Sequence, residues 1–191
     1  VAAVTLLLFA LPAQARSVTD AYGETVDVPD QPQRVVALSE LDLDAMLALG
    51  KTPVGAVNGR GQSGLPGYLS ARAPQIDIIG DLGNVNTELL LELQPDLILT
   101  ATDRPETLEL YRAIAPTVVT AKPGEPWQSS LQLIADVLGD PDAAEAFSAS
   151  YQTRVLQARE ALAAQYGKLQ QMKDRLQQEM KELKRLMGDE E

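Results

Sequence analysis

Short apolar runs alternate with segments of helical pattern through most of the chain, and this alternation limits its possible folds more than any other feature. The runs are rich in Val and Ile, and polar or glycine-rich loops follow them. Such runs are typical of parallel strands that are buried on both faces. The predicted strands cover residues 34–38, 54–57, 76–79, 96–100 and 117–120. The pattern therefore predicts an α/β fold.

The segments between the predicted strands have the composition and the boundaries of helices. Gly50 and Gly139 follow two of them, and glycine is common just beyond a helix C-terminus. Ahead of the first strand, two β-prone runs within residues 17–28 predict an edge hairpin. The predicted helices cover residues 41–49, 87–93, 106–114 and 127–138. We expect a parallel-sheet lobe over residues 16–140, with helices on both faces of the sheet.

The composition changes after residue 155. From 156 to 191 the chain contains no Val, Ile, Thr, Pro or Phe, while Leu, Gln, Lys, Glu and Met dominate. This composition predicts one long C-terminal α-helix that begins near Pro141 and is roughly 70 Å long if it continues to Met187. We therefore treat residues 141–191 as a separate part of the chain.

A seven-residue repeat runs along this predicted helix. The recurring positions are Val155, Leu162, Leu169, Leu176 and Leu183. The adjoining seam has Ala158, Met172 and Leu186, with Gln165 and Glu179 as interruptions. Two interpretations stay open. In the first, the chain is the product of a truncated or frame-shifted gene, and its last helix is accidental. In the second, the helix is a coiled coil that forms a homodimer or docks on a partner.

The first 15 residues have the pattern of a secretory signal peptide. Residues 1–11 are apolar but too short to span a bilayer, and Ala13-Gln14-Ala15 is a small-x-small cleavage pattern. We predict a mature chain that begins near Arg16 and a periplasmic location. The sequence has no cysteine, so we expect neither a disulfide framework nor a lipid-modified cysteine after the signal peptide.

Composition also excludes several classes of function. The formal net charge of −11 argues against a nucleic-acid partner, because phosphate binding needs a basic surface. With no histidine and no cysteine, the chain has neither a Ser-His-Asp nor a Cys-His arrangement, and a direct transition-metal site is not expected. We expect a protein that is not an enzyme and that holds no metal of its own.

The predicted topology indicates where a ligand would bind. In an open parallel sheet the ligand crevice lies beyond the carboxyl ends of the strands. The loops at these ends are residues 39–40, 58–62, 82–86, 102–104 and 122–124. They supply amides, carboxylates and three cationic side chains, a set that suits an oxygen-rich ligand of modest size.

Several sequence motifs, in a fixed order, carry a resemblance to a known family. A VTD..G..V.VP hairpin is followed by PQRVVALS, a helix that ends in ALG, and TPVGAV; a glycine-rich segment with Asn84 and Asn86, then ELLLELQPDLIL and IAPTVV, come next. The chain resembles, over about residues 17–164, the periplasmic binding proteins that serve ABC importers of ferric siderophores, haem and cobalamin.

The resemblance implies a bilobal protein whose two α/β lobes are joined by a long helix and hold the ligand between them. Proteins of this kind deliver a preformed iron chelate to an ABC permease in the inner membrane, without chemistry on it. The strands of the second lobe are not present in this sequence. The alternative is a coiled-coil interaction protein that uses the α/β lobe as a scaffold.

The resemblance also implies roles for six residues. Glu88 falls where a carboxylate pairs with arginines of the permease, although an acidic residue in a first turn also favours the helix dipole. The residues in ligand-contact loops are Arg60, Arg104, Asn58, Asn84 and Asp103. The two guanidinium groups suit an anionic chelate, whereas Asn and Asp are also ordinary turn residues.

The expected ligand is a ferric siderophore, of the citrate-like or hydroxamate type. A haem receptor would need an axial ligand, and the tyrosines Tyr22, Tyr68 and Tyr111 have no sequence context that supports this role. We therefore expect iron that is already wrapped by a chelator, with no cofactor bound directly.

Overall fold

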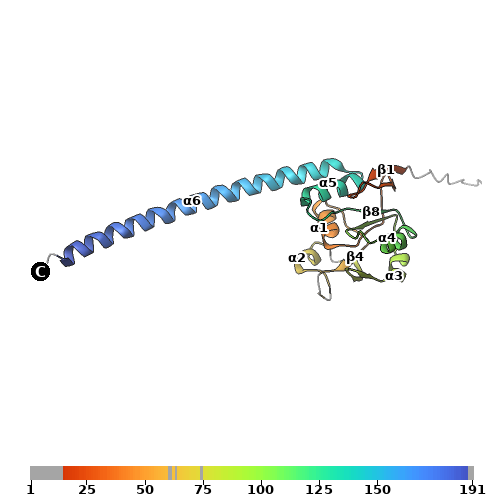
Figure 1. The fold of residues 1–191 in the computed structure, drawn as a ribbon, viewed down its shortest axis with the longest axis horizontal. Coiled ribbons are helices and arrows are strands. Elements are labelled where there is room, and N and C mark those ends of the chain that lie inside the picture. Colours follow the sequence, from red (N-terminus) through yellow and green to blue (C-terminus); the bar gives the residue numbers. More distant parts are fainter. Residues whose placement is uncertain (1–14, 60–61, 63, 74, 189–191) are drawn as a thin grey trace, which may run out of the picture. The chain divides into compact units, whose positions relative to one another are not determined.

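The computed structural model describes residues 15–59, 62, 64–73 and 75–188 (Figure 1). The chain divides into two units, Val1–Phe147 and Ser148–Glu191. The predicted signal peptide lies outside the described residues except for Ala15, which begins the first strand.

Unit 1 contains a two-stranded hairpin and a six-stranded sheet. The hairpin pairs β1 with β2 in antiparallel fashion, and the sheet has the order β6-β5-β4-β3-β7-β8 with every pair parallel except β5–β6. The strands are β1 (Ala15–Thr19), β2 (Thr25–Pro29), β3 (Val35–Ala37), β4 (Gly55–Asn58), β5 (Asp77–Asp81), β6 (Asn84–Val85), β7 (Leu97–Thr100) and β8 (Thr117–Val119). The predicted α/β lobe with a mainly parallel sheet is confirmed.

The helices alternate with the strands. They are α1 (Glu40–Ala48), α2 (Gly67–Ser70), α3 (Thr87–Glu92), α4 (Pro105–Arg112), α5 (Trp127–Val137) and α6 (Pro141–Gly188). The one-turn helix α2 and the two-residue strand β6 were not predicted. Both are too short for hydrophobic periodicity to mark them, because one turn or two residues do not complete a repeat.

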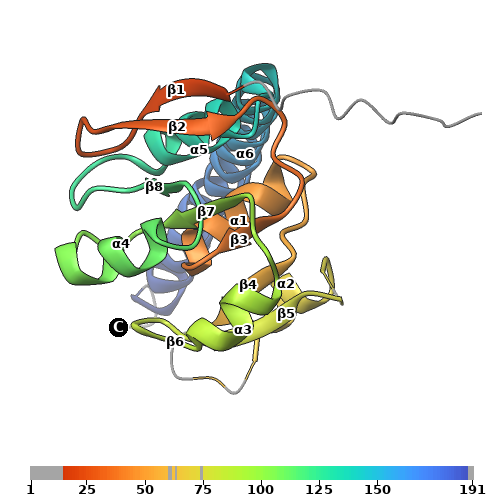
Figure 2. The ribbon, with the colours of Figure 1, turned by 90° about the vertical axis from the view of Figure 1, so that its right-hand side faces the viewer.

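Hydrophobic clusters cover both faces of the sheet. Successive residues of a strand point to opposite faces, and β3 shows this directly. Val35 and Ala37 pack in a cluster with residues of α1 and α5, whereas Val36 lies in a second cluster with Leu90 of α3 and Tyr111 of α4. Figure 2 shows α3 and α4 in green and α1 in orange, separated by the strands. The sheet is thus covered as the sequence predicted.

The strand order places a topological switch point beside β3. The chain proceeds from β3 to β4 and β5 on one side, and then returns through α3 to place β7 on the other side of β3. The loops that leave β3 and β7 therefore diverge to opposite faces of the sheet. The crevice between such loops is the place where open α/β sheets bind ligands.

The first two turns of α6 pack within unit 1. Ala144 is buried in a small cluster with Leu131 and Ala135 of α5. Phe147 meets Trp127 edge to face, with ring centroids 6.2 Å apart. These contacts fix the start of the long helix that the sequence predicted.

From Ser148 to Gly188, unit 2 is one helix that continues through Gly167 (Figure 1). In the described part of unit 2, every side chain is exposed except the partly buried Ser148 and Val155. No helix among the described residues is both long and apolar enough to cross a membrane.

Gly80 provides a test of the β5–β6 hairpin. Its φ is +131°, and a Cβ at this position would collide with the carbonyl oxygen of Asn84 and lie 3.1 Å from the Asn86 nitrogen. We expect Gly80→Ala to lower the free energy of unfolding by about 1–3 kcal/mol in denaturant titrations. Gly64→Ala is the control, because a Cβ there meets nothing within 4 Å. Equal stability of the two variants would contradict the strained geometry.

Candidate ligand-binding site

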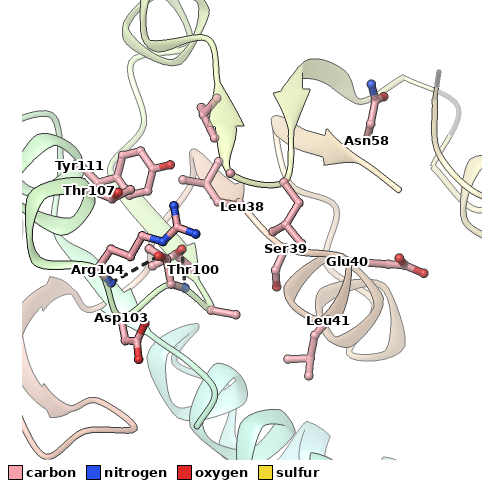
Figure 3. Close-up of a pocket in the computed structure, with 15 residues that line it drawn as sticks. Leu38, Ser39, Glu40, Leu41, Asn58, Thr100, Asp103, Arg104, Thr107 and Tyr111 are labelled. Atoms are coloured by element: carbon pink, nitrogen blue, oxygen red, sulfur yellow. Dashed lines mark hydrogen bonds between the residues drawn. The ribbon is translucent and has the colours of Figure 1, made fainter. Parts of the chain in front are cut away.

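A cavity of about 520 Å³ lies at the carboxyl ends of β3, β4 and β7 (Figure 3). Its volume is in the range of small-molecule sites. The lining residues are Leu38, Ser39, Glu40 and Leu41 after β3, Asn58 of β4, Leu82, Gly83 and Val85 around the β5–β6 turn, Thr100 to Arg104 after β7, and Thr107 and Tyr111 of α4. The cavity therefore occupies the switch point of the sheet.

Side chains fix the conformation of the loop that follows β7. The Thr102 backbone N–H donates to Thr100 Oγ1 at 3.2 Å, and the Arg104 N–H donates to Thr102 Oγ1 at 3.4 Å. The Tyr22 hydroxyl, from the β1–β2 turn, donates to Asp103 Oδ2 at 3.1 Å. These bonds turn the backbone so that Asp103 and Arg104 leave the loop in different directions (Figure 3).

Arg104 and Tyr111 form the most polar wall of the cavity. Arg104 extends from the loop toward the middle of the cavity, and the Tyr111 hydroxyl lies on the same side (Figure 3). Within the described part of the chain, no carboxylate pairs with the guanidinium of Arg104. Tyr111 is only 5% exposed, and burial raises the pKa of its hydroxyl. The pair thus offers a cation and a protonated donor to an anionic oxygen.

Asn58 lies on the other side of the cavity from Arg104 (Figure 3). Its Nδ2 donates to Asp81 Oδ1 at 2.9 Å, which fixes the orientation of the amide. Asn58 Oδ1 is buried and has no hydrogen-bond partner among the described residues. A buried acceptor without a partner is uncommon in folded proteins, and because this oxygen is not exposed to the cavity, a ligand would reach it only after a local rearrangement.

Two carboxylates line the cavity, and a tyrosine hydroxyl binds each of them. Glu40 Oε1 accepts from Tyr68 at 3.0 Å, and Asp103 accepts from Tyr22. Among the described residues, the lining of the cavity therefore combines one cation with two carboxylates and several hydroxyl groups. Such a lining suits a ligand that carries both anionic oxygens and hydrogen-bond donors.

Asp42 connects the strand ends below the cavity. Its carboxylate is completely buried and accepts from the Ser39 hydroxyl at 2.6 Å and from the Thr120 hydroxyl. The Thr120 hydroxyl also lies 3.2 Å from the Thr100 carbonyl oxygen. Burial raises the pKa of Asp42 to about 6, and the two hydrogen bonds limit this rise. This network joins the ends of β3, β7 and β8, and two of its residues, Ser39 and Thr100, line the cavity.

The structure brings three of the residues named from the sequence into one cavity: Asn58, Asp103 and Arg104. Asn84 lies in β6, is exposed, and does not line it. Arg60 lies outside the described residues. Glu88 is exposed in the first turn of α3, where its N–H donates to Asn86 Oδ1 at 3.0 Å.

Thr107 and Tyr111 were not predicted as site residues. Tyr111 lies three positions after Leu108, and this spacing is typical of the buried face of a helix. Only the placement of α4 beside β7 shows that the Tyr111 hydroxyl reaches the cavity. Among the described residues, no cluster of three or more His, Cys, Asp or Glu side chains could hold a metal ion.

The family model described as "Periplasmic binding protein" matches residues 15–175. The chain belongs to this family. Its members are binding proteins and not enzymes, and the resemblance to siderophore-type members is confirmed.

Two curated relatives come from Bacillus subtilis strain 168. "Probable siderophore-binding lipoprotein YfiY" is 31% identical over 82% of this chain and 48% of its own length. "Iron(3+)-hydroxamate-binding protein YxeB" is 29% identical over 72% of this chain and 40% of its own length. The chain spans less than half the length of each of these two relatives.

A solved structure has the same fold. It is Staphylococcus aureus SirA complexed with staphyloferrin B, with a TM-score of 0.69 and 28% identity, over 79% of this chain and 51% of SirA. About four fifths of the chain thus has a fold that this solved structure shares.

Asp42 gives the stability of the lobe a specific pH dependence. The pKa of an aspartate without these surroundings is 3.8, and that of folded Asp42 is about 6. Between these values the folded chain binds more protons than the unfolded chain, so this contribution to stability is present at low pH and is lost as the pH rises through about 6.

We therefore expect Asp42→Asn to gain stability relative to the parent chain, by up to about 3 kcal/mol, as the pH is raised from about 4 to 7. Urea unfolding at a series of pH values measures the difference. Asp44→Asn, on the exposed side of the same helix, is the control. A difference that does not vary with pH would show that Asp42 does not titrate in this window.

Proposed function

We propose that the α/β lobe is part of the substrate-binding component of an ABC importer and captures a ferric siderophore in the cavity at the switch point. The observation that carries this proposal is the Arg104 guanidinium, which has no carboxylate partner in the described chain and lies beside the Tyr111 hydroxyl. The relatives named for siderophore or iron(3+)-hydroxamate binding support it.

The ligand chemistry follows from the lining of the cavity. Iron arrives as cargo that the chelator already surrounds, so the protein recognises the oxygens and the outer surface of the chelate. Arg104 and Tyr111 would bind its anionic oxygens. Carboxylate and hydroxamate siderophores both offer such oxygens, and we propose this class of ligand, either citrate-like or hydroxamate.

We propose that the protein acts in the periplasm, after cleavage of a signal peptide, and delivers its ligand to an inner-membrane permease. The resemblance to two-lobed receptors implies that a second lobe closes over the ligand. A lobe that acts alone leaves one side of the chelate in water, so its affinity should be lower than that of a closed receptor.

Calorimetric titration of the chain with ferric citrate and with a ferric hydroxamate tests the binding site. We expect saturable binding, and we expect Arg104→Ala to weaken it by about 10-fold to 100-fold, because a charge-assisted hydrogen bond is lost. The Arg104 side chain makes no capping bond to α4, so the variant should fold normally.

Arg159→Ala is the matched control, because Arg159 is an exposed arginine of α6 and does not line the cavity. Equal affinities of the Arg104→Ala variant and the parent chain would place the ligand elsewhere.

Glu88 is the residue that we propose for docking on the permease. It is exposed on α3 and makes no ion pair within the described residues, so it is accessible to an arginine of a partner. We expect Glu88→Ala to slow siderophore uptake by cells about tenfold, while calorimetric binding of the siderophore stays unchanged. Glu92→Ala, at an exposed position of the same helix, is the control. Uptake at the parental rate would remove this role.

We also propose a second candidate function, dimerisation through the helix of unit 2. The observation that favours it is the row of leucines at Leu162, Leu169, Leu176 and Leu183, each at least 54% exposed. A regular apolar row of this kind on an isolated helix is typical of a coiled-coil seam.

A further inference from the structure

The apolar side chains of unit 2 form two rows on one face of the helix. Leu162, Leu169, Leu176 and Leu183 make the first row, and Tyr166, Met180 and Met187 belong to the second. All seven are between 54% and 78% exposed. Residues four positions apart lie on the same side of a helix, so the two rows form one continuous surface. A continuous row of exposed apolar side chains on a helix is typical of an interaction site.

The spacing assigns a heptad register. With the leucines at the d positions, the residues four places later, Tyr166, Lys173, Met180 and Met187, occupy the a positions. Seven of these eight seam residues are apolar, and the seam extends over almost four heptads. The seam predicted from the sequence was less regular, because it paired the leucines with positions three places later and so included Gln165 and Glu179.

We propose that this face binds the same face of a second copy of the chain, as a parallel two-stranded coiled coil. The proposal rests on the second candidate function and adds its orientation, register and number of helices. Leucine at successive d positions is typical of parallel dimers, and Lys173 is the single polar residue at an a position. A lone lysine at such a position selects one register and one oligomeric state, at some loss of stability.

The charges beside the seam favour the parallel orientation. In this register Glu179 is at g and Lys184 is at e of the next heptad. A parallel pair places each Glu179 opposite Lys184 of the other copy, which gives two ion pairs between the copies. An antiparallel pair sets g against g and e against e, so Glu179 and Lys184 cannot meet. In a single copy, Arg175 Nε donates to Glu179 Oε1 at 3.1 Å within the same helix, and this exposed bond competes with the pair across the seam.

Sedimentation of the full chain over a range of concentrations tests the pairing. We expect a dimer, and we expect Leu176→Asn to weaken it by about 100-fold or more, because two buried leucines are lost per dimer. Gln178→Asn is the matched control, because Gln178 is at the outer f position of the same turn. Chemical denaturation of the lobe, followed through Trp127, shows whether each variant is folded.

Disulfide cross-linking tests the register, because the chain has no cysteine of its own. In a parallel pair the two copies of an a position lie within about 6 Å, a distance that a disulfide can span. We expect Met180→Cys to oxidise to a covalent dimer and Gln178→Cys to stay monomeric on a reducing-agent-free gel.

A dimer in sedimentation that neither variant links, or that both link equally, would overturn the parallel register and leave the dimer. A monomer at every concentration would overturn both the register and the second candidate function. Neither result would affect siderophore binding by the lobe, which calorimetry measures separately.

Discussion

The lobe depends on β3, which is buried on both faces and paired on both edges. β3 pairs with β4 on one edge and with β7 on the other, and its three residues are buried. A strand in this position must be apolar at every residue, and it must be followed by a polar turn so that the chain can leave the sheet. Both requirements are met by Val35, Val36 and Ala37 before Ser39 and Glu40. The candidate ligand cavity begins at this exit.

The chemistry of the cavity depends on the small number of charged side chains that line it and on the hydrogen bonds that their carboxylates accept. The tyrosines Tyr22 and Tyr68 each bind one carboxylate at its rim, and the only lining guanidinium in the described chain stays without an acidic partner. An anionic oxygen that enters the cavity therefore meets an arginine whose interactions are not already satisfied. An unpaired guanidinium can donate two hydrogen bonds to a carboxylate of a ligand, because none of its donors is used by an acidic neighbour.

The sequence alone predicted the buried strands and the long helix, because these depend on apolar periodicity. It also indicated the sheet edge at which the candidate cavity lies, because that edge follows from the general topology of parallel sheets, and ligand binding there stays a prediction. It did not predict β6 or α2, which are too short to show a period. It also did not identify Tyr111, because a residue on the buried face of a helix and one at the edge of a cavity have the same local pattern. Asn84 was expected to contact the ligand, but its strand places it outside the cavity. The prediction for Arg60 stays untested, since that residue lies outside the described chain.

The Asp42 network also has a consequence for the order in which the lobe can assemble. Its carboxylate accepts from Thr120, which is 78 residues away along the chain, and from Ser39, which is three residues away. The N-terminal cap of α1 can therefore form early, whereas the contact to β8 requires closure of a long loop, which is slow. We therefore expect the hydrogen bond between Asp42 and Thr120 to form after the local cap of α1. A chain that ends before residue 120 would leave the Asp42 carboxylate with Ser39 as its only partner of these two. The ends of β3 and β7 would then lack the hydrogen bond that joins them to the end of β8.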